Sequence, residues 1–242
     1  MAAEYAAFRP TYPPAFFAAF ARHCAAPNVV WDCGCGNGQA ALDLAAQFAR
    51  VEASDASAAQ LAQAVRHPRI RYRQAPAHAS GLAGASVDGV LVAAAIHWFA
   101  GADFSAEVRR VARPGAAMAW IGYLPLQLDC APLQALLDRF YNEDLAPWWP
   151  PQRQLVDRAY ADLEFPGREC PFPRGLWIER QWDLARLLGY LGTWSAVQAA
   201  REQGVEQPLA ELGRELAGHW PEQGATPLLL RWPFMGRWGR IG

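Results

Sequence analysis

The chain lacks lysine altogether, because all 22 of its basic residues are arginine. Lysine is the phosphate-binding residue of a Walker A loop and the amine of a pyridoxal Schiff base, so both kinds of site are excluded. No apolar run reaches the about 18–20 residues that a membrane-spanning helix needs. The first residues, MAAEYAAFRPTYP, carry an acid, an arginine and prolines in the window of a signal peptide, and the cysteine count is odd. We therefore expect a cytoplasmic protein with reduced thiols and no membrane partner.

An excess of charge of one sign is also missing, since the 22 arginines face 23 acidic residues and the net charge is −1. This balance offers no general attraction to nucleic acid. One local basic run, RHPRIRYR at Arg66–Arg73, leaves RNA open as an alternative partner, although the run alternates as an edge strand does. Cys33 and Cys35 form a C-x-C pair, but four ligands at zinc spacing are missing. We expect neither a metal nor a nucleic-acid partner.

What is present favours a packed α/β fold. Apolar residues make up 52% of the chain and charged residues 19%, and 242 residues suit a single domain spanning 1–242. Strand and helix patterns alternate over residues 28–124, which predicts a parallel sheet covered by helices on both faces. The expected strands are Val29–Asp32, Arg50–Asp55, Ile70–Ala75, Val87–Ile96 and Ala117–Leu124, and the expected helices are Pro13–Cys24, Gln39–Phe48, Ser57–Val65 and a helix through Phe104, Val108 and Val111 that Pro114–Gly115 ends.

The character of the chain changes after Pro125, where longer helical patterns and many tryptophans appear. We expect residues 125–242 to form a helical cap together with the last two strands, and residues 1–24 to form a helical segment that covers the site. The expected helices of the cap are Pro132–Leu145, Gln152–Leu163, Leu184–Gln203 and Leu209–Ala217, and the expected strands are Leu176–Asp183 and the tail PLLLRWPFMGRWGRI.

The stretch VVWDCGCGNGQAALDLA, Val29 to Ala45, places Gly34, Gly36 and Gly38 between a strand and a helix. Glycines let the backbone approach a ligand closely, and the helix start offers unpaired N–H groups to a negative group. In an open parallel sheet this turn lies at the ligand-binding edge. Asp55, 21 positions after Gly34, ends the second strand, where a carboxylate can accept both hydroxyls of a ribose. The pattern predicts a cofactor that contains adenosine.

The spacing of the glycines decides between cofactors. The dinucleotide fingerprint needs a glycine at position 39, which is Gln39, and the tighter G-x-G-x-G turn suits a compact carboxylate. Asp32, at the end of the strand, could hold an ammonium group. A carboxylate, an ammonium and an adenosine diol together describe S-adenosylmethionine. An NAD-dependent oxidoreductase and a glycine turn without any ligand remain the alternatives.

These motifs resemble the class I S-adenosylmethionine-dependent methyltransferases, and within them the type 11 small-molecule group that includes trans-aconitate methyltransferase-like proteins. The resemblance implies a Rossmann-like, doubly wound sheet of seven strands whose last strand is antiparallel. It also implies S-adenosylmethionine as cofactor, S-adenosylhomocysteine as product, and a small-molecule acceptor methylated on oxygen or on a carboxyl group. The segments that carry it are YAAFRPTYP, VVWDCGCGNGQAALDLA, VEASDASAAQL, SVDGVLVAAAIHWF and EVRRVARPG, with YLGTWSAVQ in the cap.

The resemblance also implies which residues bind the cofactor. Asp32, Gly34, Cys35 and Gly36 would bind the methionine moiety, and Asp55 the ribose. The N-terminal segment would close over the cofactor, and the residues after the second, third and fourth strands would complete the site. The remaining candidates are Tyr5, Arg9, Tyr12, Ala56, Gln60, Ala75, Pro76, Ala77, Ala93 and Ala94.

The acceptor is expected beside the end of the fourth strand. His97 is the candidate base for a hydroxyl acceptor, with a purely orienting role as the alternative. Aromatic residues that could wall the acceptor pocket are Trp98, Phe99, Tyr141, Trp148 and Trp149, and Arg153, Arg158 and Arg174 could either neutralise an acidic acceptor or form a solvated face.

Three positions depart from the family's pattern, since His78, Ala94 and Ala100 stand where a Glu, a Gln and an Asp are usual. Each departure removes a polar group near the cofactor or the acceptor. They keep a non-catalytic binding or scaffold protein as the alternative to an enzyme. We expect a monomer or a homodimer.

Overall fold

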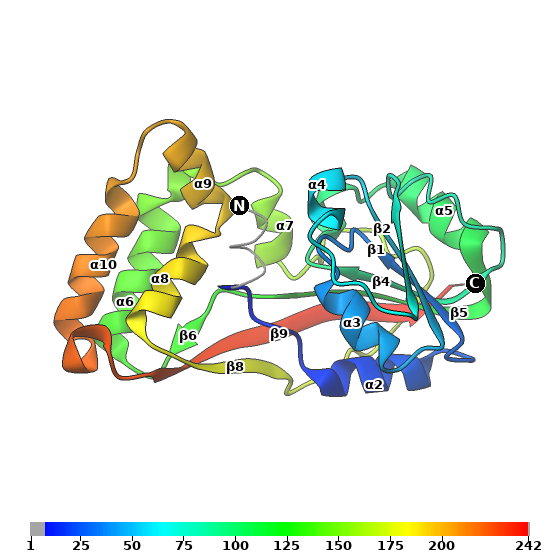
Figure 1. Cartoon of the computed structure of the whole chain (residues 1–242), viewed down its shortest axis with the longest axis horizontal. Helices are drawn as coiled ribbons and strands as arrows, with labels where there is room; N and C mark the ends of the chain where they lie inside the picture. Colours follow the sequence, from blue (N-terminus) through cyan, green and yellow to red (C-terminus); the bar gives the residue numbers. More distant parts are fainter. Residues whose placement is uncertain (1–7, 242) are drawn as a thin grey trace.

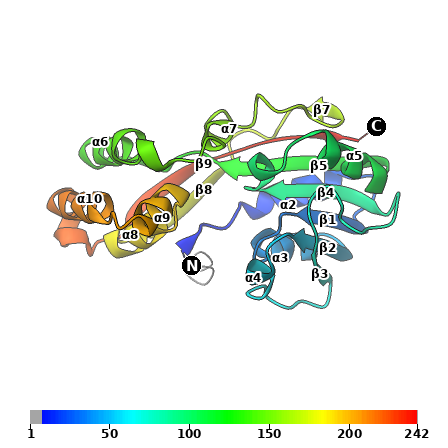
Figure 2. The same cartoon turned by 90° about the horizontal axis from the view of Figure 1, so that it is seen from above.

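The computed structural model describes residues 8–241, which form a mixed sheet with helices on both faces and a group of helices at one end (Figure 1). Five parallel strands follow one another across the sheet in the order β3-β2-β1-β4-β5 (Figure 2). The parallel sheet confirms the α/β fold class expected for a Rossmann-like protein. The strands are β1 (Val29–Cys33), β2 (Arg50–Asp55), β3 (Ile70–Gln74), β4 (Val87–Ala93) and β5 (Ala112–Tyr123).

The last strand, β9 (Leu228–Arg240), is antiparallel to β5, as expected. Its second half pairs with β5, whereas its first half leaves the parallel sheet and pairs with β8 (Trp177–Trp182). Two short strands, β6 (Gln127–Leu128) and β7 (Arg168–Cys170), also pair with β9. The described residues therefore contain nine strands where seven were expected, because two- and three-residue strands are too short to show alternation.

Helices cover the sheet on both faces because their apolar residues recur at helical spacing. Phe16, Phe17 and Phe20 of α2 (Pro14–His23) are buried against one face, which α3 (Gln39–Ala45) also covers. The opposite face carries Trp31 and Val92 and packs against α5 (Ala102–Val111). The strand residues alternate between these two cores, as a sheet buried on both faces requires.

The helical end of the molecule lies on the left of Figure 1, away from β1 and β4. Its helices are α6 (Ala131–Arg139), α8 (Leu184–Gly192), α9 (Ser195–Glu202) and α10 (Gln207–His219), with a π-helical turn at Phe140–Asp144 and a 3-10 turn at Ala146–Trp148. The short helix α7 (Arg153–Asp157) lies between these helices and the sheet (Figure 1).

Several expected elements are shorter or broken. The helix through Phe104, Val108 and Val111 ends at Val111, and Pro114–Gly115, expected to end it, lie within β5. The helix expected over Gln39–Phe48 ends at Ala45. The helix expected over Leu184–Gln203 breaks at Trp194, whose backbone is extended (ψ 140°). The helix expected over Gln152–Leu163 ends after α7 because Ala159 and Tyr160 adopt positive φ (51° and 62°). The strand expected to reach Ile96 ends at Ala93, since Ala94 also has positive φ (50°). The helix expected over Ser57–Val65 is a single turn, α4 (Ala58–Leu61), with no buried residue to hold it longer.

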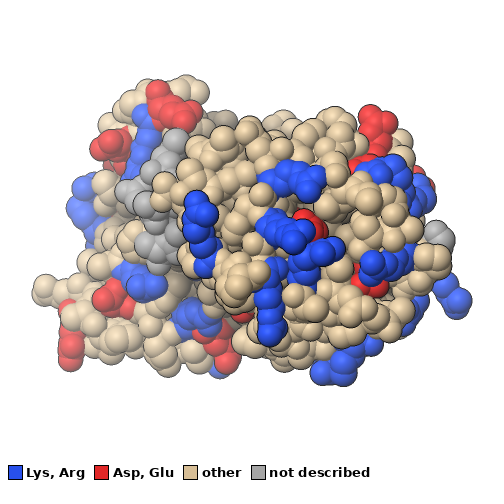
Figure 3. All heavy atoms as spheres, turned by 45° about the vertical axis from the view of Figure 1, so that its right-hand side comes forward, with Lys and Arg blue, Asp and Glu red and all other residues tan. Residues whose placement is uncertain are grey.

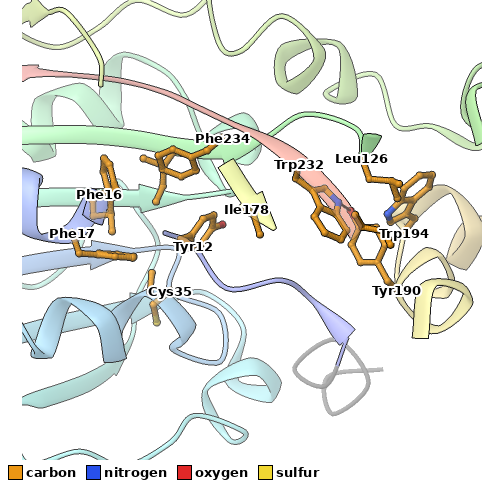
Figure 4. Packing of buried hydrophobic residues seen from close by; sticks show 14 of the residues in the cluster. Tyr12, Phe16, Phe17, Cys35, Leu126, Ile178, Tyr190, Trp194, Trp232 and Phe234 are labelled. Carbon is orange, nitrogen blue, oxygen red and sulfur yellow. Dashed lines mark hydrogen bonds between the residues drawn. The ribbon is translucent and has the colours of Figure 1, made fainter. Parts of the chain in front are cut away.

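Aromatic side chains on β9 join the sheet to the helical end (Figure 4). Phe234 packs on Phe16 of α2 with ring centroids 5.2 Å apart. Trp232, two residues earlier on the same strand, packs edge-on against Tyr190 of α8 at 5.4 Å and donates a hydrogen bond to its hydroxyl (3.1 Å). One strand therefore anchors both ends of the molecule.

Candidate functional site

The glycine turn after β1 is held in a conformation that needs glycine. Gly34 and Gly36 adopt positive φ (69° and 55°), and the Gly34 N–H donates to the carbonyl of Ser54 on β2 (2.8 Å). A Cβ on Gly34 would lie 2.8 Å from the Cβ of Ala95, so this glycine allows close packing. A Cβ on Gly36 would have only the Gln60 side-chain oxygen nearby, at 3.9 Å. The absence of a side chain at Gly36 therefore leaves space for a ligand beside the turn.

A cavity of about 320 Å³, which we call the glycine-loop cavity, opens beside this turn. The ends of β1, β2 and β4, the start of α3 and the segment before α2 supply its walls, as expected for the carboxyl edge of a parallel sheet. The candidates that line it are Tyr12, Asp32, Gly34, Cys35, Gly36, Asp55, Gln60, Ala93 and Ala94.

Asp32 lies at the bottom of the glycine-loop cavity with a fully buried side chain. Neither carboxylate oxygen has a hydrogen-bond partner among residues 8–241. Burial, with a smaller contribution from the nearby Asp55 carboxylate, raises the pKa of Asp32 to about 7. A buried carboxylate without a partner is unfavourable, and a bound cation would satisfy it.

Asp55, at the end of β2, has a different role in the same cavity. One carboxylate oxygen accepts a hydrogen bond from the Gly36 N–H (2.8 Å), and the other accepts one from the Ser57 N–H (2.8 Å). The carboxylate thereby ties the glycine turn to the start of α4 and still lines the cavity. Each carboxylate oxygen keeps a further lone pair that can accept a hydroxyl proton.

Several candidates for cofactor binding do not line the glycine-loop cavity. Tyr5 lies outside the described residues. Ala75 donates its N–H to the Asp55 carbonyl (3.0 Å), so the end of β3 lies beside the site without entering its wall. The others that stay outside the wall are Ala56, Pro76 and Ala77. Arg9 donates to the Tyr123 hydroxyl (2.8 Å) and the Thr193 carbonyl (3.1 Å), and lines a second cavity.

This second cavity, of about 200 Å³, lies beyond the ends of β4 and β5, and we call it the Arg153 cavity. Ala94 and Trp98 line both cavities, so the two are neighbours across these residues. Sequence reasoning expected His97 and Trp98 here and missed most of the remaining wall. The additional residues are Gly122, Tyr123, Pro150, Val156, Tyr160, Thr193 and Ser195.

The missed residues differ in whether the sequence carried a signal for them. Tyr123 ends β5, and the rule that ligands bind at the carboxyl edge could have found it. Tyr160 reaches the cavity only because of the positive-φ turn after α7, for which the sequence gives no sign. Asn37, Gln39 and Ala40 of the glycine-loop cavity follow directly from the turn-to-helix geometry.

His97 lies on the short 3-10 helix Ile96–Trp98 and lines the Arg153 cavity. Its ring is nearly parallel to the ring of Tyr160 at 6.4 Å, and its Nδ1 is buried with no hydrogen-bond partner among the described residues. Burial and then the positive charge of Arg153 lower the pKa of His97 to about 4. The imidazole is therefore neutral at neutral pH and can accept a proton.

Four aromatic candidates for the acceptor pocket line neither cavity. Phe99 packs against Phe104 at 5.0 Å, beneath the glycine turn. Tyr141 and Trp149 instead flank the guanidinium group of Arg153. Trp148 packs against the hydrophobic core.

Of the residues that depart from the family's pattern, only Ala94 lines a cavity at this site. His78 is exposed, and Ala100 lines a separate cavity on the other side of the sheet, with Phe104 and Trp120. Two of the three departures therefore change no wall of the glycine-loop or Arg153 cavities.

Other kinds of site find little support in the described part of the chain. Between residues 8 and 241, no three His, Cys, Asp or Glu side chains are grouped to hold a metal ion. Nor is any helix in that range both long and apolar enough to cross a membrane. All five cysteines are free thiols. Figure 3 shows a face on which arginines gather with acidic side chains among them. In the basic run, which includes edge strand β3, Arg71 lies 3.9 Å from the carboxylate of Glu52, so an acid partly offsets its charge.

Comparisons with known proteins point to one family. A methyltransferase domain family matches residues 31–120. A structure from Anaeromyxobacter dehalogenans, described as a "putative type II methyltransferase", is 46% identical, covers 97% of this chain and 98% of its own, and has a TM-score of 0.88. A "putative methyltransferase" of Dictyostelium discoideum is 28% identical over 216 residues, which are 88% of this chain and 82% of that protein. A further structure, from Anabaena variabilis, shares the fold at 20% identity and a TM-score of 0.55, covering 90% of this chain and 95% of its own.

Proposed function

Because this chain belongs to the class I S-adenosylmethionine-dependent methyltransferases, we propose that it methylates a small molecule on an oxygen atom or a carboxyl group. The narrower resemblance to trans-aconitate methyltransferase-like enzymes stays a prediction, as do a cytoplasmic location and a monomeric or dimeric state.

The unpartnered carboxylate of Asp32 is the observation that carries the proposal. A buried carboxylate fits the ammonium group of the methionine moiety, and the missing side chain at Gly36 leaves room for the rest of that moiety. Asp55 would accept the ribose hydroxyls, and Tyr12 would cover the cofactor from the segment before α2. When bound, S-adenosylmethionine supplies a methyl group activated by a sulfonium. Tyr5, Ala56 and Ala75–Ala77 stay predictions as further contacts.

The Arg153 cavity is the proposed acceptor site, since it adjoins the glycine-loop cavity at Ala94 and Trp98. Its walls orient the acceptor and keep water away, and the positioning of reactants accounts for much of the rate in such transfers. His97 is neutral and would accept the proton of a hydroxyl acceptor at a ring nitrogen. A carboxylate acceptor would need no base.

Calorimetric titration with S-adenosylhomocysteine, S-adenosylmethionine and NAD tests the cofactor assignment. We expect both adenosyl compounds to bind and NAD not to bind. Asp55→Ala should weaken binding of S-adenosylhomocysteine at least about tenfold, because two hydrogen bonds to a charged acceptor are lost. Asp103→Ala, an exposed acid on α5 that lines neither cavity, is the matched control and should bind like the unmodified protein. Binding of NAD in place of the adenosyl compounds would overturn the proposal.

A further inference from the structure

The side chain of Arg153 gives the acceptor cavity a chemical preference that the fold alone does not. Resting on the methyltransferase function proposed above, we propose that the Arg153 cavity takes a small carboxylic acid with an apolar or aromatic body. Its carboxylate binds the two terminal nitrogens of Arg153 and remains unmethylated there as an anchor. The methyl acceptor is then a different group of the same molecule.

The guanidinium group of Arg153 is held in place from three sides. Its Nε donates to a carboxylate oxygen of Asp157 (3.0 Å), one turn later on α7, and to the hydroxyl of Tyr141. The ring centroids of Tyr141 and Trp149 lie 4.9 Å and 4.8 Å from its central carbon. An arginine fixed in this way loses little conformational entropy when it binds a ligand.

The terminal nitrogens of Arg153 remain available after these contacts are made. Neither Nη1 nor Nη2 donates a hydrogen bond to any residue within the described range 8–241. Arg9, the other arginine of the cavity, differs because both of its terminal nitrogens donate to the protein, to Tyr123 and Thr193. The outer edge of the Arg153 fork matches the geometry of a carboxylate that accepts two parallel hydrogen bonds.

The charge of the cavity favours an anion. Both formally charged side chains in its described wall, Arg9 and Arg153, are cationic, and no acidic residue lines it. Asp157 contacts Arg153 through Nε and lies outside the wall. The positive charge of Arg153 also contributes to the lowered pKa of His97, so its field reaches the neighbouring imidazole. A bound carboxylate would offset that field.

The position of Arg153 indicates an anchor rather than a methyl acceptor. Arg153 lines only the second cavity, whereas Ala94 and Trp98 line both. A carboxylate on Arg153 is therefore held by a residue that is not part of the shared wall, and two charge-assisted hydrogen bonds lower its nucleophilicity. Trp98, Val156 and Tyr160 supply apolar and aromatic surface for the rest of the molecule, within about 200 Å³.

The test compares carboxylates with their neutral amides on protein saturated with S-adenosylhomocysteine. Benzoate and phenylacetate are titrated against benzamide and phenylacetamide by NMR, following the His97 ring signals. We expect each carboxylate to bind at least about tenfold more tightly than its amide, because hydrogen bonds to a charged group are worth more, and to raise the pKa of His97. If no carboxylate binds more tightly than its amide, the inference is overturned.

Variants assign the preference to Arg153. Arg153→Gln should abolish the difference between carboxylate and amide, and Arg153→Lys, which keeps the charge without the fork, should retain part of it. Arg158→Gln is the matched control, since Arg158 follows on the same segment and pairs with Asp162 outside the cavity. An undiminished preference in Arg153→Gln would contradict the assignment even if carboxylates bind well.

The outcomes separate this inference from the function on which it rests. Binding of S-adenosylhomocysteine without a preference for carboxylates overturns the inference and leaves the methyltransferase function standing. Failure to bind S-adenosylhomocysteine overturns the proposed function. The comparison of carboxylate and amide, repeated on protein without S-adenosylhomocysteine, then still reports on Arg153.

Discussion

Asp32 and Asp55 are two carboxylates of one cavity whose surroundings give them different roles. Asp55 accepts hydrogen bonds from two backbone N–H groups, so its negative charge organises the glycine turn. Asp32 has no such partner and is buried, so its pKa rises from 3.8 to about 7. The unfolded chain therefore loses this proton at lower pH than the folded chain does. The free energy of unfolding of the ligand-free protein therefore falls as pH rises from 3.8 to about 7, because over this range the native state binds more protons than the unfolded state.

A cation bound at Asp32 should make ligand binding depend on pH in the opposite direction. Affinity for S-adenosylhomocysteine should rise about tenfold between about pH 6 and pH 8, as the carboxyl group with a pKa near 7 ionises. Calorimetric titration across this range measures the effect. Asp32→Asn should bind weakly with little pH dependence.

Asp43 supplies the control for this pH effect. Burial also raises the pKa of this residue, to about 6, but it lines neither cavity. Asp43→Asn should therefore keep the rise in affinity seen in the unmodified protein. If instead Asp43→Asn removed the rise and Asp32→Asn kept it, Asp32 would not hold the ammonium group.

His97 should affect the rate of transfer rather than cofactor binding. For a hydroxyl acceptor, His97→Gln should lower kcat by about 10²-fold or more, because the variant cannot accept the proton. The unmodified protein should keep its protonation state at His97 from neutral pH down to about pH 5, since the pKa of His97 is about 4. Transfer of a labelled methyl group measures the rate. Exposed His78→Gln should leave it unchanged, and an equal rate in His97→Gln would assign His97 an orienting role only.

At the scale of elements, β9 is the strand on which both halves of the molecule depend. Trp232→Ala should destabilise the protein by about 3–5 kcal/mol, because a fully buried indole and its contacts with Tyr190 and Trp182 are lost. Trp177→Ala on the neighbouring β8 should cost about 0.5 kcal/mol or less, since its side chain is 43% exposed. Urea unfolding followed by far-ultraviolet circular dichroism measures both. Equal losses in the two variants would contradict the burial of Trp232 as the cause.

The elements that sequence reasoning predicted well are those with a dense apolar pattern. β1, β2 and β4 are nearly continuous runs of buried residues and α2 carries apolar residues at helical spacing, so their positions follow from the chain itself. The break at Trp194 and the early end of α7 at Ala159 follow from backbone conformations set by tertiary packing. Local periodicity carries no information about such conformations.

The candidate site divides in the same way. Asp32, Gly36 and Asp55 were predictable because each lies at or shortly after the end of β1 or β2, and both strands end at the same edge of the sheet. Tyr160 and Arg153 come from a segment over 50 residues beyond β4. Arg153 is placed by α7, which packs against the 3-10 helix at His97, and the backbone carbonyl of Tyr160 accepts a hydrogen bond from Arg237 of β9. The sequence offered an anionic acceptor or a solvated face as roles for Arg153, and the structure makes it part of a cavity wall.

At the scale of the whole molecule, the two cavities and the helical end form one arrangement. Arg9 links the segment before α2 to β5 through Tyr123 and to the helical end through Thr193. The Arg153 cavity thus draws its wall from the parallel sheet, from α7 and from the start of α9. The division into a cofactor-binding core at 28–124 and a cap at 125–242 stays a prediction.

The position of β9 in the chain has a consequence for biosynthesis. Every strand that pairs with β9, from β5 to β8, leaves the ribosome before it. Until Leu228–Arg240 has been translated and has emerged, the outer edge of β5 stays unpaired and Tyr190 lacks its ring contact and hydrogen bond with Trp232. An open strand edge of this kind is a site of aggregation. The nascent chain is therefore exposed to misassembly until β9 appears, and chaperones that bind extended apolar segments would act in that interval.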